Sequence, residues 1–337
     1  MTSENRKLPA VLGIGNALVD VMIVLEDDRL LSDFGLPKGS MTLVDAELSA
    51  KIYDATATNK KEVTTGGSVA NSIHALASLG GNCGYLGKIK DDELGNIFKL
   101  EFDRKGIKTH IRYSNKETGR AMAMVSPDSE RTFATYLGAA ADLKPEDINS
   151  PDFEGYAVLY IEGYLVQDHR LIENTVKAAK EKGLKVAVDL SSFNVVEQNL
   201  DFLKRIISDY TDIVFANEEE ALAYTGLNPE KALEKIASQC EIAVVKTGKR
   251  GSLIKSRDEM IRVKSIHAVA VDTTGAGDGY AAGFLYGYTN GLNLEACGNI
   301  ASLVSGKIVE VVGAKLPEEA WPEIRDLVKQ LTIARTL

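Results

Sequence analysis

The chain has 337 residues, 45% hydrophobic and 26% charged, which is the ordinary composition of a soluble globular protein. Its 48 acidic and 39 basic residues give a net charge of −9, and no stretch gathers Lys and Arg into a stripe, so nucleic acid is not expected as a partner. No apolar run approaches the roughly 18 residues of a membrane-spanning helix, and the widely spaced Cys83, Cys240 and Cys297 indicate neither disulfides nor zinc, so we expect a cytoplasmic protein without membrane contact.

Strand-like and helix-like segments alternate along most of the chain. This rhythm predicts an α/β fold with a doubly wound, mostly parallel sheet flanked by helices. Near-continuous apolar segments such as Ala243-Val-Val245 favour strands that are buried on both faces. In chain order, the expected strands lie at 11–14, 83–89, 158–161, 185–190 and 212–216, and the expected helices at 68–79, 95–105, 168–182, 200–210, 276–290, 294–311 and 317–331.

One region departs from this rhythm. Between Ile107 and Leu137 three β-like segments follow one another, with turn chemistry at Pro127. Two further β-like segments lie near the N-terminus, and together they predict a small β-sheet lid. We therefore predict a lid of residues 16–45 and 107–137 on an α/β core of residues 1–15, 46–106 and 138–337. Without repeats or a long linker, lid and core are expected to form one folding unit.

The most informative segment is Asp272-Thr-Thr-Gly-Ala-Gly-Asp278. The β-favouring residues 268–271 precede it and a helical pattern follows, which predicts a glycine turn between a strand and a helix. Gly275 and Gly277 would let a ligand approach the backbone, and the first N–H groups of the helix attract an anion such as a phosphate. Asp278 beside such a site would repel its ligand unless it accepts a proton from an attacking hydroxyl. Taken alone, the segment also fits an ordinary Gly-rich turn with an acidic residue in the first helical turn.

A second glycine turn is expected at Thr65-Gly-Gly-Ser-Val-Ala-Asn71. Gly66 and Gly67 permit close approach, and the amide of Asn71 suits vicinal hydroxyls, although a diglycine turn with Ser68 as helix cap explains the same residues. Gly13-Ile-Gly-Asn-Ala-Leu-Val-Asp20 follows the first strand and offers Asn16 and Asp20 as sugar ligands. It lacks the third glycine of a dinucleotide fingerprint.

Two further segments are less specific. Asn217 and Glu220 in Phe215-Ala-Asn-Glu-Glu-Glu220 could position a hydrated Mg²⁺, although acidic residues in a first helical turn also complement the helix dipole. Lys246-Thr-Gly-Lys-Arg-Gly251 lacks the phosphate-loop pattern and favours a β-turn. The four histidines share no metal-ligand spacing.

These motifs together resemble the ribokinase or PfkB carbohydrate kinase family over nearly the whole chain. The resemblance rests on Gly-Asn-x-x-x-Asp at 15–20, Gly-Gly-Ser-x-x-Asn at 66–71, Asn-x-x-Glu at 217–220 and Asp-Thr-Thr-Gly-Ala-Gly-Asp at 272–278. It implies a ribokinase-like core with a β lid that transfers the γ-phosphoryl group of ATP to a primary alcohol.

The resemblance also implies roles for individual positions. Asp278 matches the catalytic base, and the amides of Gly275, Ala276 and Gly277 match the anion hole. The expected sugar-binding positions are Asp20, Gly66, Gly67 and Asn71, and the expected ATP positions are Thr247, Gly248 and Gly251. Asn217 and Glu220 match the Mg²⁺ and phosphate motif. Asp272 and Thr274, with carbonyls near Gly313, match a monovalent-cation site, which suggests K⁺.

Within the family the chain is most similar to the adenosine kinase branch. Its opening at 15–20 and Asp189-Leu-Ser-Ser-Phe193 resemble that branch, although Asp189 stands in place of Asn and Thr274 in place of another Asn. By the same resemblance Arg131 would reach the phosphates when the lid closes, and Glu162 would contact the substrate.

The leading hypothesis is an ATP- and Mg²⁺-dependent kinase acting on the 5′-hydroxyl of a purine nucleoside, with adenosine as the first candidate. The alternative within the family is a ribokinase- or fructokinase-like enzyme that phosphorylates a small furanose sugar. A catalytically silent sensor would require a broken base or anion hole, and a nicotinamide dehydrogenase lacks its glycine fingerprint. Both a monomer and a homodimer are compatible with the sequence.

Overall fold

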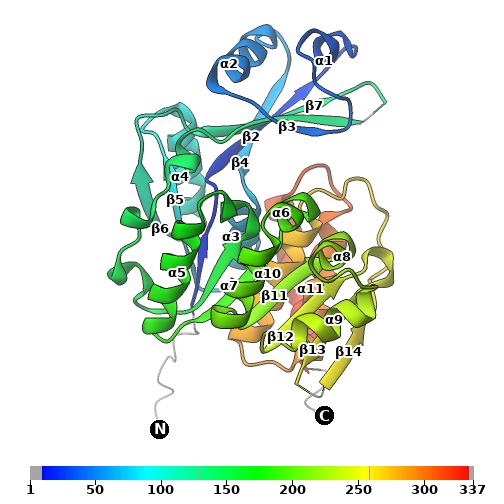
Figure 1. Ribbon diagram of the computed structural model, residues 1–337. Helices are drawn as coiled ribbons and strands as arrows, with labels where there is room; N and C mark the ends of the chain where they lie inside the picture. Colours follow the sequence, from blue (N-terminus) through cyan, green and yellow to red (C-terminus); the bar gives the residue numbers. More distant parts are fainter. Residues whose placement is uncertain (1–9, 129, 258, 334–337) are drawn as a thin grey trace.

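The computed structural model describes residues 10–128, 130–257 and 259–333, and its core is a nine-stranded sheet (Figure 1). The strand order is β14-β13-β12-β11-β10-β9-β1-β5-β6. All neighbours from β12 to β6 run parallel, while β13 and β14 form an antiparallel edge. The strands are β1 (Ala10–Ile14), β5 (Cys83–Ile89), β6 (Lys108–Tyr113), β9 (Tyr156–Glu162), β10 (Lys185–Asp189), β11 (Ile213–Asn217), β12 (Ile242–Lys246), β13 (Ser252–Ser256) and β14 (Glu259–Val263).

Helices cover both faces of this sheet because its central strands are apolar on both sides, as in Ile242–Lys246, where four of the five residues are buried. One hydrophobic core packs helices α3, α4, α10, α11 and α12 against one face, and a second core packs α5, α7, α8 and α9 against the other. The helices are α3 (Ser68–Ser78), α4 (Glu93–Arg104), α5 (His169–Glu181), α6 (Phe193–Gln198), α7 (Leu200–Tyr210), α8 (Glu218–Thr225), α9 (Pro229–Ala237), α10 (Ala276–Thr289), α11 (Leu294–Ile308) and α12 (Trp321–Ile333). The doubly wound core is therefore confirmed.

A second sheet of five strands projects from one end of the core (Figure 1). Its strand order is β3-β8-β7-β2-β4, and α1 (Arg29–Asp33) and α2 (Ala46–Ala55) lie on one of its faces. Val19, Val21 and Ile23 pack on that face, so Asp20 lies on the opposite one. The strands are β2 (Leu18–Val24), β3 (Met41–Leu43), β4 (Lys61–Gly66), β7 (Gly119–Val125) and β8 (Arg131–Tyr136). This sheet is the lid of the following sections.

The boundary between lid and core differs from the sequence prediction at two places. Residues 108–113, which were predicted in the lid, form β6 and pair in parallel with β5 at the edge of the large sheet. Residues 46–66, which were predicted in the core, supply α2 and β4 to the lid. Parallel pairing is set by partners distant in sequence, so strand propensity alone does not reveal it. Residues 1–9 and 334–337 of the predicted core lie outside the described residues.

The segment before the anion-hole motif also differs from prediction. Residues 268–271 do not form a strand; they belong to a connection in which Val269 and Val271 are exposed. The backbone N–H of Val271 donates to the carbonyl of Val309 at 2.7 Å, which ties this connection to the end of α11. The helix predicted to follow is present as α10. Among the described residues, no helix combines the length and apolar character that crossing a membrane requires.

Candidate active site

The site is built where four neighbouring parallel strands end. Glu162, Asp189, Asn217 and Lys246 are the last residues of β9, β10, β11 and β12. In the sheet register Glu162 lies opposite Asp189, and Asn217 lies opposite Lys246. The carboxyl ends of parallel strands form the usual binding crevice of an open α/β sheet. Polar groups separated by up to 84 positions in the sequence are thereby brought to one edge.

The N-terminus of α10 faces this edge. Gly275 precedes the helix with a φ of 75°, a left-handed conformation that favours glycine. A Cβ atom at Gly275 would come within 2.5 Å of the Cβ of Ala314, so the close approach of the chain also requires glycine. The first N–H groups of a helix have no partner within it, and together with the helix dipole they attract an anion. The predicted anion hole therefore has the local structure that its chemistry needs.

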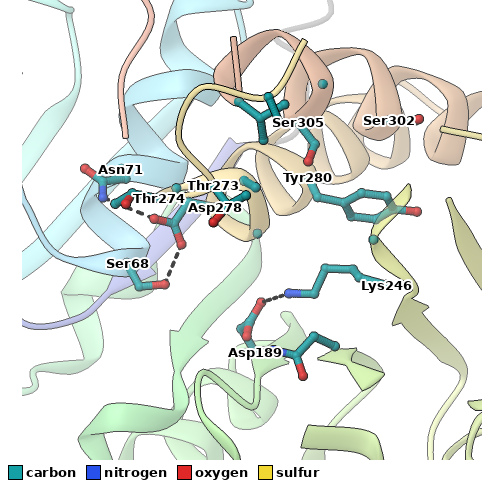
Figure 2. A pocket seen from close by; sticks show the side chains of 18 of the residues that line it. Ser68, Asn71, Asp189, Lys246, Thr273, Thr274, Asp278, Tyr280, Ser302 and Ser305 are labelled. Carbon is teal, nitrogen blue, oxygen red and sulfur yellow. Dashed lines mark hydrogen bonds and ion pairs between the residues drawn. The ribbon is translucent and has the colours of Figure 1, made fainter. Parts of the chain in front are cut away.

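Asp278 lies in the first turn of α10 and is held from the side of α3 (Figure 2). The hydroxyl of Ser68 donates to its Oδ1 at 2.7 Å, and the side-chain amide of Asn71 donates to its Oδ2 at 3.1 Å. Burial raises the pKa of Asp278 from 3.8 to about 6, although both hydrogen bonds and the nearby Lys246 act to lower it. A carboxylate that is oriented and weakly basic near neutral pH is suited to accept a proton.

A cavity of about 1050 Å³ is lined at one extreme by lid strands and at the other by the C-terminal half of α11. It brings together most of the residues predicted from the sequence. Those that line it are Asp20, Gly67, Asn71, Asn217, Glu220, Gly248, Gly251, Thr274, Gly275, Ala276, Gly277 and Asp278. The anion hole and the proposed base therefore share one cavity with the residues predicted to bind the substrate and ATP.

Asn16 and Glu162 contact one another in the interior. The carboxylate of Glu162 accepts from the backbone N–H and the side-chain amide of Asn16, at 2.9 and 2.6 Å, and from the backbone N–H of Val69 at 3.0 Å. Burial raises the pKa of Glu162 to about 7 against the effect of these hydrogen bonds. Glu162, the last residue of β9, is thus bound to the segment between β1 and β2 and to the start of α3, and its predicted substrate contact remains a prediction.

The lid and core meet at the second glycine turn. A Cβ at Gly66 would lie 2.1 Å from Oδ1 of Asp20, so glycine here makes room for that carboxylate. Gly67 has a φ of 98° and precedes α3 as its cap, the position for which Ser68 was the alternative. Burial raises the pKa of Asp20 to about 6, although the positive charge of Lys315 partly offsets this rise. The side-chain oxygen of Asn71 is buried and has no hydrogen-bond partner within the described part of the chain.

Asn217 and Glu220 form a reciprocal cap at the start of α8. The amide of Asn217 donates to Oε1 of Glu220 at 2.7 Å, and the backbone N–H of Asn217 donates to Oε2 at 2.7 Å. Burial raises the pKa of Glu220 to about 7, and Lys246 opposes this rise. Among the described residues no group of three or more His, Cys, Asp and Glu side chains is arranged to hold a metal ion. The carboxylate of Glu220 lines the cavity. It fits a cation such as Mg²⁺, which keeps several of its waters and needs few protein ligands.

The segment predicted as a β-turn connects β12 and β13. The hydroxyl of Thr247 donates to the carbonyl of Gly251 at 2.9 Å, so Thr247 closes the turn. Gly248 and Gly251 have φ values of 56° and 95° and line the cavity. The turn thus presents backbone to the cavity at the two glycines.

Arg131 and Asp272 pair with one another. A guanidinium nitrogen of Arg131 contacts Oδ2 of Asp272, which also accepts from the backbone N–H of Gly313 at 2.6 Å. Oδ1 of Asp272 accepts from the backbone N–H and the hydroxyl of Thr274, at 3.0 and 2.8 Å. With N–H and O–H donors and an Arg cation around both oxygens, Asp272 does not fit a monovalent-cation site in this arrangement. The predicted contact of Arg131 with phosphates remains a prediction.

Several residues of the site were missed in the sequence-based selection. Ser68 holds Asp278, and Asp189 and Lys246 form an ion pair at 3.0 Å in the cavity wall (Figure 2). Others come from the connection after β14 and from α11 and its C-terminal end. They include Ile266, His267, Ala268, Ala270, Ser302, Ser305 and Val309. A departure from the family pattern at Asp189 was the one signal that pointed toward this group.

The predicted anion hole lies beside an oriented carboxylate in a cavity at the strand ends of a doubly wound sheet, an arrangement that fits a phosphotransferase with an alcohol as acceptor. The family model described as "pfkB family carbohydrate kinase" matches residues 39–321, and this chain belongs to that family. It is a sugar or nucleoside kinase.

Solved structures and a curated relative support the same assignment. The adenosine kinase from Sinorhizobium meliloti is 34% identical, with a TM-score of 0.84 over 96% of this chain and 99% of that one. A probable sugar kinase from Rhizobium etli CFN 42 is 33% identical, with a TM-score of 0.83 over 97% and 99%. An uncharacterized sugar kinase from Archaeoglobus fulgidus is 30% identical over 71% of this chain and 96% of its own length. The adenosine kinase branch suggested by the motifs is therefore supported, together with sugar kinases.

Proposed function

We propose that this kinase transfers the γ-phosphoryl group of ATP to the 5′-hydroxyl of a purine nucleoside, with adenosine as the first candidate. The observation that carries the proposal is the apolar lid face above the acceptor end of the cavity. Ala121 and Phe133 line the cavity from adjacent lid strands, on the same face as Asp20. Met41 and Leu43 continue this face on β3, and each is 54% exposed.

Such a face matches a nucleobase better than a free sugar. A purine is planar and gains from contact with an aromatic ring, whereas a sugar carries hydroxyls around its whole rim. The polar groups lie on the other side of the acceptor space. Asp20 and the unpaired side-chain oxygen of Asn71 are acceptors suited to the vicinal hydroxyls of a ribose.

In the proposed reaction the hydroxyl oxygen of the acceptor attacks the γ-phosphorus, and its proton passes to Asp278. The bond from that phosphorus to the β–γ bridging oxygen breaks, and ADP leaves with the electron pair. The amides of Gly275, Ala276 and Gly277 would stabilise the charge of the transferring group. Glu220 would hold Mg²⁺ through water, and the bound cation supplies charge neutralisation of the phosphates.

The opposite end of the cavity suits the remainder of ATP. Gly248 and Gly251 expose backbone there, and Ser302 and Ser305 on α11 add hydroxyls. The total volume of about 1050 Å³ lies at the upper end of the range for single-ligand pockets, which fits two substrates side by side.

The test is a panel of acceptors with Mg²⁺ and ATP, read by ADP release and by mass spectrometry of the product. Adenosine, inosine and guanosine are compared with ribose and fructose, and we expect AMP from adenosine at the highest kcat/KM. Phosphorylation of ribose or fructose without any of the nucleosides would refute the nucleoside assignment. It would establish the sugar kinase, the second candidate, which the sugar-kinase relatives and the hydroxyl-binding groups Asp20 and Asn71 favour.

A further inference from the structure

The ion pair between Lys246 and Asp189 has no role in the function described so far. Lys246 is the last residue of β12, and its ammonium nitrogen lies 3.0 Å from Oδ2 of Asp189, the last residue of β10. Both side chains line the cavity, and they are 15% and 7% exposed. In Figure 2 the Lys246 side chain extends across the space below the first turn of α10.

Lys246 also lies against the anion hole itself. A Cβ atom built on Gly277 would be 3.3 Å from the ammonium nitrogen of Lys246. The glycine therefore brings the backbone of the first helical turn and a cation to the same place. An anion bound to the amide of Gly277 would lie within reach of this cation.

The charges around Lys246 show why a cation is needed there. Three carboxylates face it from three elements, namely Asp189 on β10, Glu220 on α8 and Asp278 on α10. These groups raise the pKa of Lys246, although burial acts to lower it, so the amine stays protonated. Together with the proposed Mg²⁺ and the backbone dipoles, Lys246 would therefore offset the repulsion between these three acidic side chains and the polyphosphate of ATP.

Asp189 is held in place independently of Lys246. Its Oδ1 accepts from the backbone N–H of Ser191 at 2.9 Å, and Ser191 has a φ of 67°, which is uncommon for a residue other than glycine. The hydroxyl of Ser191 accepts from the backbone N–H of Gly163 at 2.8 Å, and its carbonyl accepts from the hydroxyl of Tyr164 at 3.1 Å. This framework fixes the carboxylate to which Lys246 is bound, and so directs the Lys246 side chain toward α10.

We propose that Lys246 is a phosphate-binding residue of this kinase, which contacts the γ-phosphoryl group beside the amide of Gly277, and that Asp189 positions it. The proposal rests on the phosphoryl transfer described under the proposed function. As the γ-phosphorus moves from the bridging oxygen of ADP to the acceptor oxygen, the ammonium group stabilises the charge on its outer oxygens. The proton taken from the acceptor still passes to Asp278, so Lys246 gains and loses none.

The alternative is that Lys246 only neutralises the charge of Asp189 and does not bind phosphate. A double variant that removes both members of the ion pair distinguishes these two explanations. Lys246→Met removes the cation and leaves Asp189 as a buried carboxylate without its partner, whereas Asp189→Asn with Lys246→Met removes both members of the ion pair. Lys88→Met is the matched control for loss of a buried lysine. Its ammonium group pairs with Asp147 at 2.7 Å, it is 12% exposed, and it lies on β5 away from the cavity lining.

The measurements are kcat and the dissociation constants of ADP and of a non-hydrolysable ATP analogue, both with Mg²⁺, by calorimetry. For Lys246→Met and for the double variant, we expect kcat to fall about 100-fold, as for loss of one oxyanion-hole donor. We also expect the analogue to bind about 10-fold or more weaker, because a charge-assisted hydrogen bond is lost, with ADP changed less than about threefold. Lys88→Met should leave the ratio of analogue to ADP affinity unchanged.

Recovery of wild-type kcat and analogue affinity in the double variant would overturn the proposal, because Lys246 would then only balance Asp189. An equal loss of ADP and analogue affinity would also overturn it. Should Lys246→Met fail to fold, the double variant alone carries the test. Failure of the proposed substrate class would give a different result. The wild-type protein would bind the analogue more tightly than ADP, yet it would phosphorylate no nucleoside in the panel.

Discussion

Arg131 on lid strand β8 and Asp272 in the connection before α10 form an ion pair in which the side chains are 16% and 10% exposed. Asp272 also accepts hydrogen bonds from the backbone N–H groups of Thr274, which precedes Gly275, and of Gly313. Gly313 adjoins Ala314, against which Gly275 packs. The position of the lid is thereby linked to the segment that shapes the start of α10.

Arg131→Met should loosen both partners of this contact at once. Removing one member of a buried pair leaves its charge uncompensated, so we expect local opening to become easier. The measurement is hydrogen exchange followed by mass spectrometry, in which peptides from β8 and from residues 272–275 should both exchange faster. Lys38→Met is the control, because Lys38 pairs with Asp28 and Asp128 within the lid. Unchanged exchange at 272–275 in Arg131→Met would contradict the link.

Asp278→Asn should abolish most activity without disturbing the fold. Loss of a general base lowers the rate by about 10²- to 10⁴-fold, and we expect kcat to fall in that range with substrate affinity nearly unchanged. The measurement is steady-state kinetics with Asp326→Asn as control, an exposed carboxylate on α12. Turnover within tenfold of wild type in Asp278→Asn would remove Asp278 from the mechanism.

The same variant should be more stable than wild type at alkaline pH. Burial raises the folded-state pKa of Asp278 from 3.8 to about 6, so its contribution to stability is present below 3.8 and is lost as the pH rises through about 6. An amide has no such dependence. We expect Asp278→Asn to be more stable by up to about 3 kcal/mol at pH 8, with the difference gone near pH 4. A melting temperature at pH 8 lower than that of wild type would argue against this account.

The pH dependence of kcat/KM should report Asp278 in the free enzyme. The base must be ionised to accept a proton, so kcat/KM should rise with pH through a midpoint near 6. The carboxylate of Asp189 raises this pKa, so Asp189→Asn should move the midpoint to lower pH. The measurement is kcat/KM at a series of pH values between about 4.5 and 8.5, which brackets the expected midpoint. A midpoint unchanged or raised in Asp189→Asn would show that another group is being titrated.

Gly275→Ala tests whether the shape of the helix start is what catalysis needs. The added methyl group would meet the Cβ of Ala314 at 2.5 Å, and φ is 75°. Gly291 has nearly the same φ, 72°, with open space where a Cβ atom would lie. Gly291→Ala therefore introduces the unfavourable backbone conformation without a steric clash. We expect kcat to fall about 100-fold in Gly275→Ala, as for a damaged oxyanion hole, and to stay within about twofold in Gly291→Ala. Equal kcat values in the two variants would show that the close approach to Ala314 is unnecessary.

Local chemistry made the glycine turn at the start of α10 predictable from the sequence. The spacing of Gly275, Gly277 and Asp278 specifies a left-handed turn, a helix start and a carboxylate in one short segment. The same applies to Gly66 and Gly67, which are required by Asp20 and by the backbone of Asn16. Motifs of this kind can be recognised from the local sequence, although the close approaches of Gly66 to Asp20 and of Gly275 to Ala314 are visible only in the structure.

The features that could not be predicted depend on distant partners. Residues 108–113 are β-like in either sheet, and only the parallel register with β5 assigns them to the core. Residues 268–271 have strand propensity but no neighbouring strand, so they form an exposed connection. The sequence around Lys246 indicates only a turn, because its contacts with Asp189 and with the start of α10 arise from the arrangement of elements that are distant in sequence.

Phe133→Ala distinguishes a nucleoside from a sugar at the level of one side chain. Phe133 lies opposite Ala123 on β7 and lines the cavity on the lid face of Asp20. If this ring packs on the base, its loss should raise KM for adenosine by about tenfold or more, since a buried aromatic contact contributes more than 1 kcal/mol. Val63→Ala is the control, because Val63 pairs with Val21 and so lies on the other lid face. A KM for adenosine unchanged by Phe133→Ala, with weaker use of ribose, would indicate instead that the lid closes directly over a sugar.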